Sequence, residues 1–138
     1  MSGPGSFKNR LAFFTLCTFA SGVLTAPADA RAHCQGSPKI TGQCFAVRGR
    51  LGVYNGIPLR IWIVGTHRML SVRSADTDDE EDGLPTPALN LLKQGAPGEF
   101  VVFGDYKVCP LAKKHAGWMR PVCVESASRL QAVKTPSR

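Results

Sequence analysis

Apolar and polar residues alternate along the chain after position 43, and this period of two is the pattern of half-buried β-strands. In the first such stretch the residues expected to face inward are Phe45, Val47, Gly49, Leu51 and Val53. Asn55-Gly56 follows, a strong signal for a hairpin turn. A second strand directs Leu59, Ile61 and Ile63 inward, and residues 67–72 form a third, in which the pattern leaves the direction of Met69 open. Three consecutive strands are therefore predicted.

The remaining pattern predicts one short helix and two more strands. Thr86 is expected to cap the helix, and Gly95 to follow its end in a left-handed conformation. A fourth strand covers residues 99–109 and is interrupted by Gly104, a candidate β-bulge. A fifth strand begins near Arg120.

The resulting order, β-β-β-α-β-β, matches the OB-fold, a five-stranded barrel whose helix lies between the third and fourth strands. We therefore predict a mainly β protein with a small five-stranded OB-like barrel, and a small open β-sandwich is the alternative. The 138 residues allow one such domain, which we place at 44–132. An irregular arm at 31–43 precedes it, and a polar, disordered tail at 133–138 follows.

The first thirty residues have the organisation of a secretory signal peptide. Lys8 and Arg10 form a basic start, residues 11–26 are uncharged and mostly apolar, and Ala28-Asp29-Ala30 is a small-x-small cleavage signal. The apolar run is shorter than the roughly 20 residues that a spanning helix needs, and no second run follows. We expect cleavage after Ala30, no transmembrane span in the mature chain, and a periplasmic or secreted location.

Cleavage would leave an even number of cysteines, Cys34, Cys44, Cys109 and Cys123, in an exported chain. In that setting cysteines are read as disulfides, and the short paired spacings of zinc sites are missing. Local pairing, Cys34–Cys44 and Cys109–Cys123, is the preferred connectivity. An OB-like barrel would also bring Cys44 near Cys109, so that pairing stays open.

Two stretches, CFAVRGRLGVYNGIPLRIWIVGTHRML (44–70) and VVFGDYKVCP with MRPVCVESA (101–110 and 119–127), resemble a family of small exported bacterial proteins of unassigned function. The resemblance covers most of the mature chain. It implies export and a compact, disulfide-containing β domain. It implies no activity, substrate or catalytic residue.

Charge gives the one positive indication of function. Removal of residues 1–30 leaves 15 basic and 9 acidic residues, and six of the acids lie within residues 76–82. The rest of the domain is therefore strongly basic. The predicted strands place basic and aromatic side chains together on an outer face, with Arg48, Arg50, Arg60, Trp62 and Arg68 as candidate ligand-binding residues. We also hypothesise that the acidic loop screens this face when no partner is bound.

Candidate catalytic and metal-binding groups are few. Asp105 and Glu125 could form a carboxylate pair on the last two strands, with His67 as a third member of a small hydrolase site. Surface ion pairs are the simpler interpretation of both carboxylates. Residues 78–83 imitate the start of a calcium loop, but the position of its bidentate glutamate is Leu89. We expect no metal site and no cofactor.

These observations favour an exported, non-enzymatic binding module with a basic β face. Its expected partner is an anionic ligand, an envelope polymer, a lipid headgroup surface or an acidic protein, and nucleic acid is not expected outside the cytoplasm. A small hydrolase and a purely structural envelope protein are the alternatives. The sequence leaves the oligomeric state open.

Overall fold

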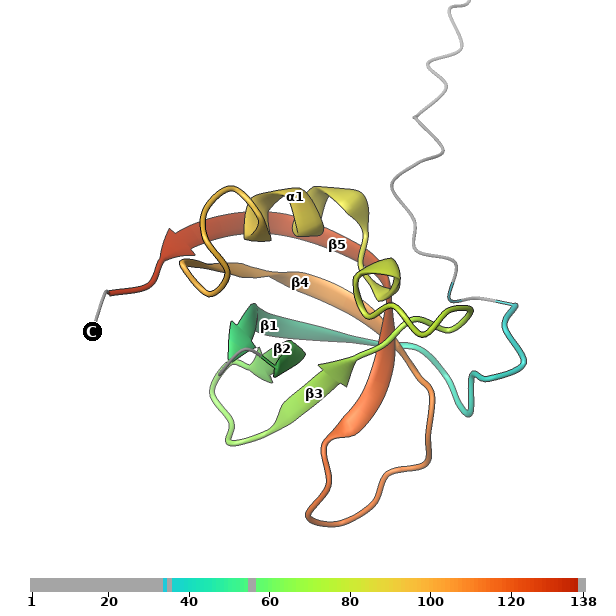
Figure 1. Cartoon of the computed structure of the whole chain (residues 1–138). Helices are drawn as coiled ribbons and strands as arrows, with labels where there is room; N and C mark the ends of the chain where they lie inside the picture. Colours follow the sequence, from blue (N-terminus) through green and yellow to red (C-terminus); the bar gives the residue numbers. More distant parts are fainter. Residues whose placement is uncertain (1–33, 35, 55–56, 137–138) are drawn as a thin grey trace, which may run out of the picture.

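The structure is a computed structural model that describes residue 34, residues 36–54 and residues 57–136. Its elements, in chain order, are β1 (Phe45–Tyr54), β2 (Ile57–Ile63), β3 (Met69–Val72), the 3-10 turn η2 (Glu81–Gly83), α1 (Thr86–Leu92), β4 (Phe100–Pro110) and β5 (Arg120–Lys134) (Figure 1). The predicted signal peptide and the Asn55-Gly56 turn lie outside the described residues. β5 extends to Lys134, past the domain boundary expected at Ala132.

The five strands form one mixed sheet that closes in a ring in the order β1-β2-β3-β5-β4. β1 pairs with both β2 and β4 in antiparallel fashion, and β3 pairs with β5 in parallel. The predicted mainly β, OB-like arrangement is confirmed, including the helix between β3 and β4. The open sandwich is wrong because the β3–β5 pairing leaves the sheet without a free edge.

Helix α1 lies along β4 and β5 (Figure 1) and contributes Ala88 and Leu92 to the core. Its ends differ from expectation. Pro85 occupies the cap position, because its carbonyl already accepts bonds from the amides of Ala88 and Leu89. The helix ends at Leu92, and Gly95 does not adopt a left-handed conformation.

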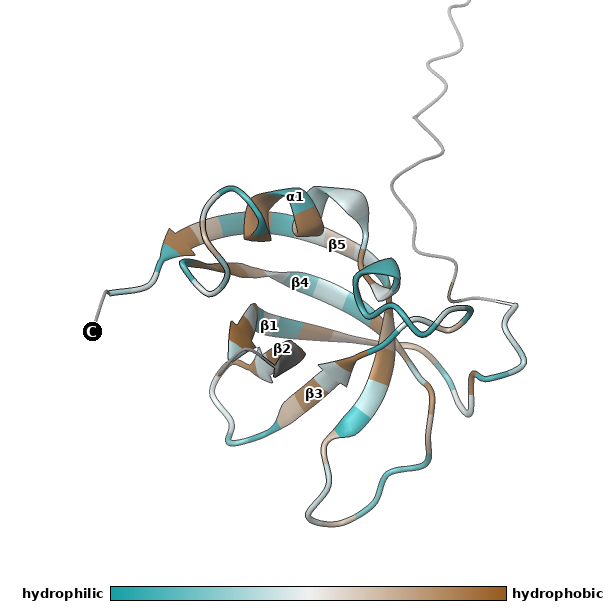
Figure 2. Cartoon of the chain, viewed as in Figure 1, coloured by the Kyte–Doolittle hydropathy of each residue, from teal (hydrophilic) through white to brown (hydrophobic). Residues whose placement is uncertain are grey.

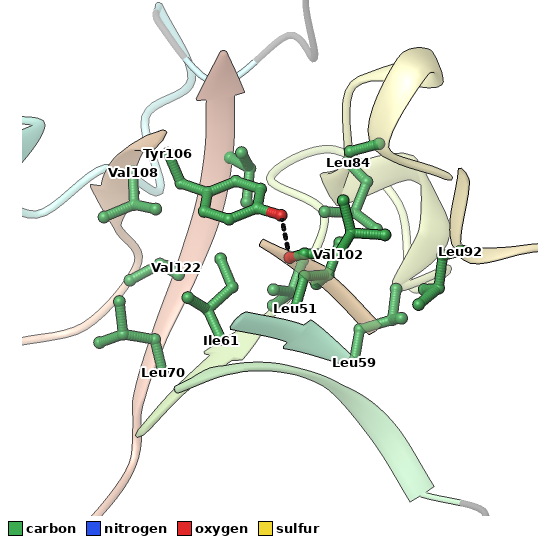
Figure 3. Packing of buried hydrophobic residues seen from close by; sticks show 13 residues of the cluster. Leu51, Leu59, Ile61, Leu70, Leu84, Leu92, Val102, Tyr106, Val108 and Val122 are labelled. Atoms are coloured by element: carbon green, nitrogen blue, oxygen red, sulfur yellow. Dashed lines mark hydrogen bonds between the residues drawn. The ribbon is translucent and has the colours of Figure 1, made fainter. Parts of the chain in front are cut away.

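The core lies inside the ring and is built from alternate residues of every strand, together with residues of α1 and of the segment before it (Figures 2 and 3). Its buried members are Leu51, Leu59, Ile61, Leu70, Val72, Leu84, Ala88, Leu92, Val102, Tyr106, Val108, Val122 and Val124. The expected inward faces of the first two strands are thereby confirmed. Leu70 is buried, so its neighbour Met69 lies on the outer face, opposite Trp62.

Tyr106 is a large, fully buried side chain at the centre of this core. Its hydroxyl donates a 2.7 Å hydrogen bond to the carbonyl of Val102 (Figure 3), and burial raises the pKa of Tyr106 well above its ordinary value. The ring lies beside two glycines that face each other across β1 and β4, Gly49 and Gly104. A methyl group on Gly49 would lie 2.3 Å from Cγ2 of Ile61 and 3.4 Å from Tyr106. These glycines therefore make room for the aromatic core.

Gly104 also marks the irregularity that the sequence suggested. The register between β4 and β5 shifts between Phe103 and Asp105, so that two residues of β5 oppose the single glycine. One of them, Arg129, has a positive φ of 49°. The predicted bulge is confirmed, and it sharpens the local bend of the sheet.

Two disulfides close one end of the molecule, Cys34–Cys123 and Cys44–Cys109, with Cα–Cα distances of 5.7 and 4.1 Å. The expected convergence of the cysteines is confirmed, whereas the preferred local pairing is wrong. Closure of the ring places the start of β1 beside the end of β4, and Cys44 therefore reaches Cys109. Cys123 is then left for the arm, whose Thr41 donates its amide to the carbonyl of Pro110 at 2.9 Å.

We expect Gly49→Ala to lower the free energy of unfolding by about 1–3 kcal/mol, the usual cost of overpacking a rigid core. The clashing atom belongs to the β-branched, fully buried Ile61, which has little freedom to move. Gly42→Ala is the matched control, since its added methyl would make an ordinary 3.5 Å contact with Pro110. Urea denaturation of both variants checks this, and equal midpoints would contradict it.

Digestion under non-reducing conditions, followed by mass spectrometry, should recover linked peptides for Cys34–Cys123 and Cys44–Cys109. Replacing Cys44 and Cys109 together by serine should lower the free energy of unfolding by about 2–5 kcal/mol, because the crosslink spans 65 residues. A peptide linking Cys109 to Cys123 would disprove this connectivity.

Candidate functional site

A groove of about 330 Å³ opens on the outer face of the sheet. It is lined by Arg50, Trp62, Val64, Gly65, Thr66, His67 and Phe103. No carboxylate is among these residues. We call it the Arg50–Trp62 groove, and two of the five predicted ligand-binding residues lie in it.

Strand register explains how the groove is assembled. Arg50 is the direct partner of Phe103 on β4 and of Trp62 on β2, and Trp62 is in turn the partner of Met69 on β3. Partners in a ladder share one face of the sheet. The four side chains consequently form a row across the outside of the ring, with a single cation among large apolar groups.

The guanidinium of Arg50 is held by aromatic groups rather than by an acid. It lies 4.8 Å from the centroid of the Trp62 ring and 5.8 Å from that of Tyr54. Its Nε donates a 3.0 Å hydrogen bond to the Tyr54 hydroxyl. No carboxylate in the described part of the chain lies within ion-pair distance of Arg50. Its terminal nitrogens are therefore available to an incoming anion.

The β2–β3 turn fixes the other wall of the groove. The indole Nε1 of Trp62 donates a 2.6 Å bond to the carbonyl of Thr66, and the Thr66 hydroxyl donates to the carbonyl of Ile63 at 2.9 Å. Gly65 has a φ of +78°, which a glycine adopts without strain. The turn thus orients Trp62 before any ligand is present.

The other three predicted residues lie elsewhere. Arg48 forms an ion pair with Asp105 at 3.3 Å, and Arg68 lines a separate hollow with residues of the β4–β5 loop. Arg60 is paired with Gly52 and Ser71 in the sheet, and its Nε is buried without a hydrogen-bond partner. The predicted face is therefore divided, with Arg50 and Trp62 at its centre.

Asp105 joins two strands through its ion pairs. Arg129 on β5 and Arg48 on β1 both donate to its carboxylate. The hydrogen bond from Arg129 is the main reason that the pKa of Asp105 lies below its ordinary value, and the bond from Arg48 acts in the same direction. The carboxylate is thus part of a structural network on the sheet surface.

The hydrolase hypothesis required Asp105, Glu125 and His67 to share a site. His67 lines the Arg50–Trp62 groove, but neither carboxylate lines that groove or the hollow that contains Arg68. Asp105 faces Ser128 across the β4–β5 ladder rather than Glu125. The structure does not assemble this set.

The acidic loop is bound to the body of the protein. Glu80 forms an ion pair with Arg73 at 2.6 Å and accepts the amide of Leu59 at 3.3 Å, and Glu81 pairs with Lys93. In the described part of the chain no arginine of the candidate face pairs with the loop, so the screening hypothesis finds no support. Among the same residues there is no cluster of three His, Cys, Asp or Glu that could hold a metal ion.

Comparisons with known proteins do not supply a family: no family model matches the chain, nor does any curated protein or solved structure. The resemblance to small exported bacterial proteins therefore stays a prediction. Within the described residues, no helix has the length and apolar character needed to cross a membrane.

Phe103, which lines the groove, and Tyr54, which holds Arg50, were not among the residues predicted from the sequence. Phe103 follows the inward-facing Val102, so alternation alone directs it outward. Tyr54 lies four positions after Arg50 on the same strand, and a register shift after Val53 accompanies its position. Alternation along β4 was enough to predict the outward direction of Phe103. The contact of Tyr54 with Arg50 depends on the register shift after Val53, which the sequence pattern does not predict.

We expect Asp105→Asn to lower the melting temperature at pH 7. Because the pKa of Asp105 is lower in the folded protein, its ionised form stabilises the fold above the unfolded-state pKa of about 4. That contribution is lost as the pH falls through the folded-state value. The difference from the wild-type protein should therefore shrink between pH 5 and pH 2. Asp78→Asn, in the exposed loop, is the control, and a pH-independent difference would contradict the assignment.

Proposed function

We propose that this protein is an exported binding module that holds an anionic polysaccharide in the Arg50–Trp62 groove. The observation that carries the proposal is the Arg50 guanidinium at the centre of the groove, which two aromatic rings and a hydroxyl position and which pairs with no acid of the described residues. An arginine so held offers a planar fork of N–H donors that suits carboxylate and sulfate or phosphate groups.

The walls of the groove suit a sugar chain. Trp62 and Phe103 line the groove with apolar ring surface on which the C–H face of a sugar ring can pack, and His67 adds ring nitrogens to the lining. The groove is an open hollow on the sheet rather than an enclosed cavity, which favours a segment of a polymer over a small, buried substrate. OB-folds bind oligosaccharides and oligonucleotides on this kind of surface.

Charge extends the binding path beyond the groove. His67 also lines the neighbouring hollow that contains Arg68. Arg50 and Arg68 therefore lie in two adjoining hollows that share His67. This arrangement suits a ligand with repeated negative charges. Long-range attraction to such a polymer would weaken as salt is added.

The compartment distinguishes polysaccharide from nucleic acid. Two disulfides indicate an oxidising environment. The signal-peptide pattern of residues 1–30 points to export into the periplasm or beyond, where acidic envelope polymers are available and nucleic acid is scarce.

The test is titration calorimetry with polygalacturonate as the probe and neutral dextran as its uncharged counterpart. Polygalacturonate should bind and dextran should not, and binding should weaken as sodium chloride is raised. Arg50→Gln should lower the affinity about tenfold or more, the scale expected when a charge-assisted hydrogen bond is lost. Trp62→Ala should act in the same direction.

Arg48→Gln is the matched control. Arg48 lies on the same strand and face as Arg50, but its charge is already neutralised by Asp105. We expect less than a twofold effect. If Arg48→Gln and Arg50→Gln lowered the affinity for polygalacturonate equally, the attraction would be nonspecific and the groove would not be the binding site. If the protein bound an acidic protein or single-stranded DNA more tightly than every anionic glycan tested, the assignment of a polysaccharide as the ligand would be wrong.

A further inference from the structure

The loop between β4 and β5, residues 111–119, exposes apolar side chains that the sheet does not use. Trp118 is 77 % exposed and Met119 is 39 % exposed. The loop projects from the ring at the end opposite α1 (Figure 1). Exposed large apolar residues at a projecting tip indicate a surface that contacts something other than water.

The loop holds its tryptophan in place. The amide of Trp118 donates to the carbonyl of His115 at 3.3 Å, and Gly117 has a φ of +79° at the third position of this turn. The His115 ring meets the indole edge to face, with 5.5 Å between the centroids. Trp118 borders three hollows and is largely exposed, so the indole is not packed into the body of the protein.

Positive charge surrounds this tip. Lys113, Lys114, Arg68 and Arg120 line the same hollows, and no carboxylate of the described residues does so. None of these four cations forms an ion pair with a carboxylate of the described residues. An apolar tip inside a basic rim is complementary to a bilayer whose headgroups are negatively charged.

We propose that the β4–β5 loop docks the protein on an anionic phospholipid bilayer, with Trp118 and Met119 inserted at the level of the headgroups. Indole suits that depth, because it has an apolar body and one N–H donor. Lys113 and Lys114 then contact lipid phosphates beside it. This site adjoins the Arg50–Trp62 groove through the hollow that contains Arg68, but Trp118 and Met119 lie outside that groove. It rests on the proposed function only for the exported location.

Shape and charge favour a bilayer over the other occupants. A polysaccharide chain would lie in a groove, whereas the indole projects. A second copy of the chain meeting the same surface would oppose like charges across the interface.

The experiment is cosedimentation of the purified protein with vesicles of phosphatidylcholine alone or of equal parts phosphatidylcholine and phosphatidylglycerol. We expect binding to the anionic vesicles only. Trp118→Ser should weaken it about tenfold, and Lys114→Gln about fivefold, the usual effect of one charge at an anionic surface. In a Trp62→Phe background Trp118 is the remaining tryptophan, and its emission should shift to shorter wavelength when anionic vesicles are added.

Val133→Ser and Lys134→Gln are the matched controls, because they remove an exposed apolar residue and a charge at the far end of β5. Both should leave vesicle binding unchanged. Arg50→Gln should also leave it unchanged. Lys113→Gln, outside both the groove and the hollow that contains Arg68, should weaken vesicle binding but leave polygalacturonate binding unchanged, so either proposal can fail alone. The bilayer proposal is overturned if anionic vesicles do not bind, if Trp118→Ser binds them normally, or if sedimentation velocity shows a dimer that Trp118→Ser dissociates.

Discussion

The fold depends on how Tyr106 is accommodated inside a narrow ring. Its ring is fully buried beside the facing pair Gly49 and Gly104, and its hydroxyl bonds to the carbonyl of Val102. A side chain at either glycine would intrude on the packed core, with Ile61 closest at Gly49 and Leu130 closest at Gly104. Because protein interiors are close-packed, these two glycines allow β1 and β4 to curve closely past the tyrosine.

The outer surface follows from that curvature. Because Leu51, Ile61 and Val102 must face inward, their neighbours Arg50, Trp62 and Phe103 must face outward, and closure of the ring aligns them in one row. The same closure brings Cys44 to Cys109 and leaves Cys123 for the arm. Core, binding face and crosslinks are thus consequences of one strand register.

Two surfaces with different chemistry result from this arrangement. The Arg50–Trp62 groove offers one oriented cation between aromatic walls, which suits a charged chain lying on the sheet. The β4–β5 loop offers a projecting indole with a rim of cations that pair with no carboxylate of the described residues, which suits a bilayer. Other basic residues are occupied structurally: Arg48 and Arg129 neutralise Asp105, and Arg73 and Lys93 hold the acidic loop. Net charge alone does not separate these roles.

Much of this could be read from the chain itself. Period-two alternation determined the strands, their inward faces and the element order, because side-chain direction in a strand is a local property. The bulge at Gly104 was also predicted, because a glycine within a strand pattern is a local indication of a bulge. The disulfide partners, the ion pair of Arg48 with Asp105 and the contact of Arg50 with Tyr54 and Trp62 were decided only by the tertiary structure. They join residues on different strands or across a register shift, and closing the ring determines which of them meet.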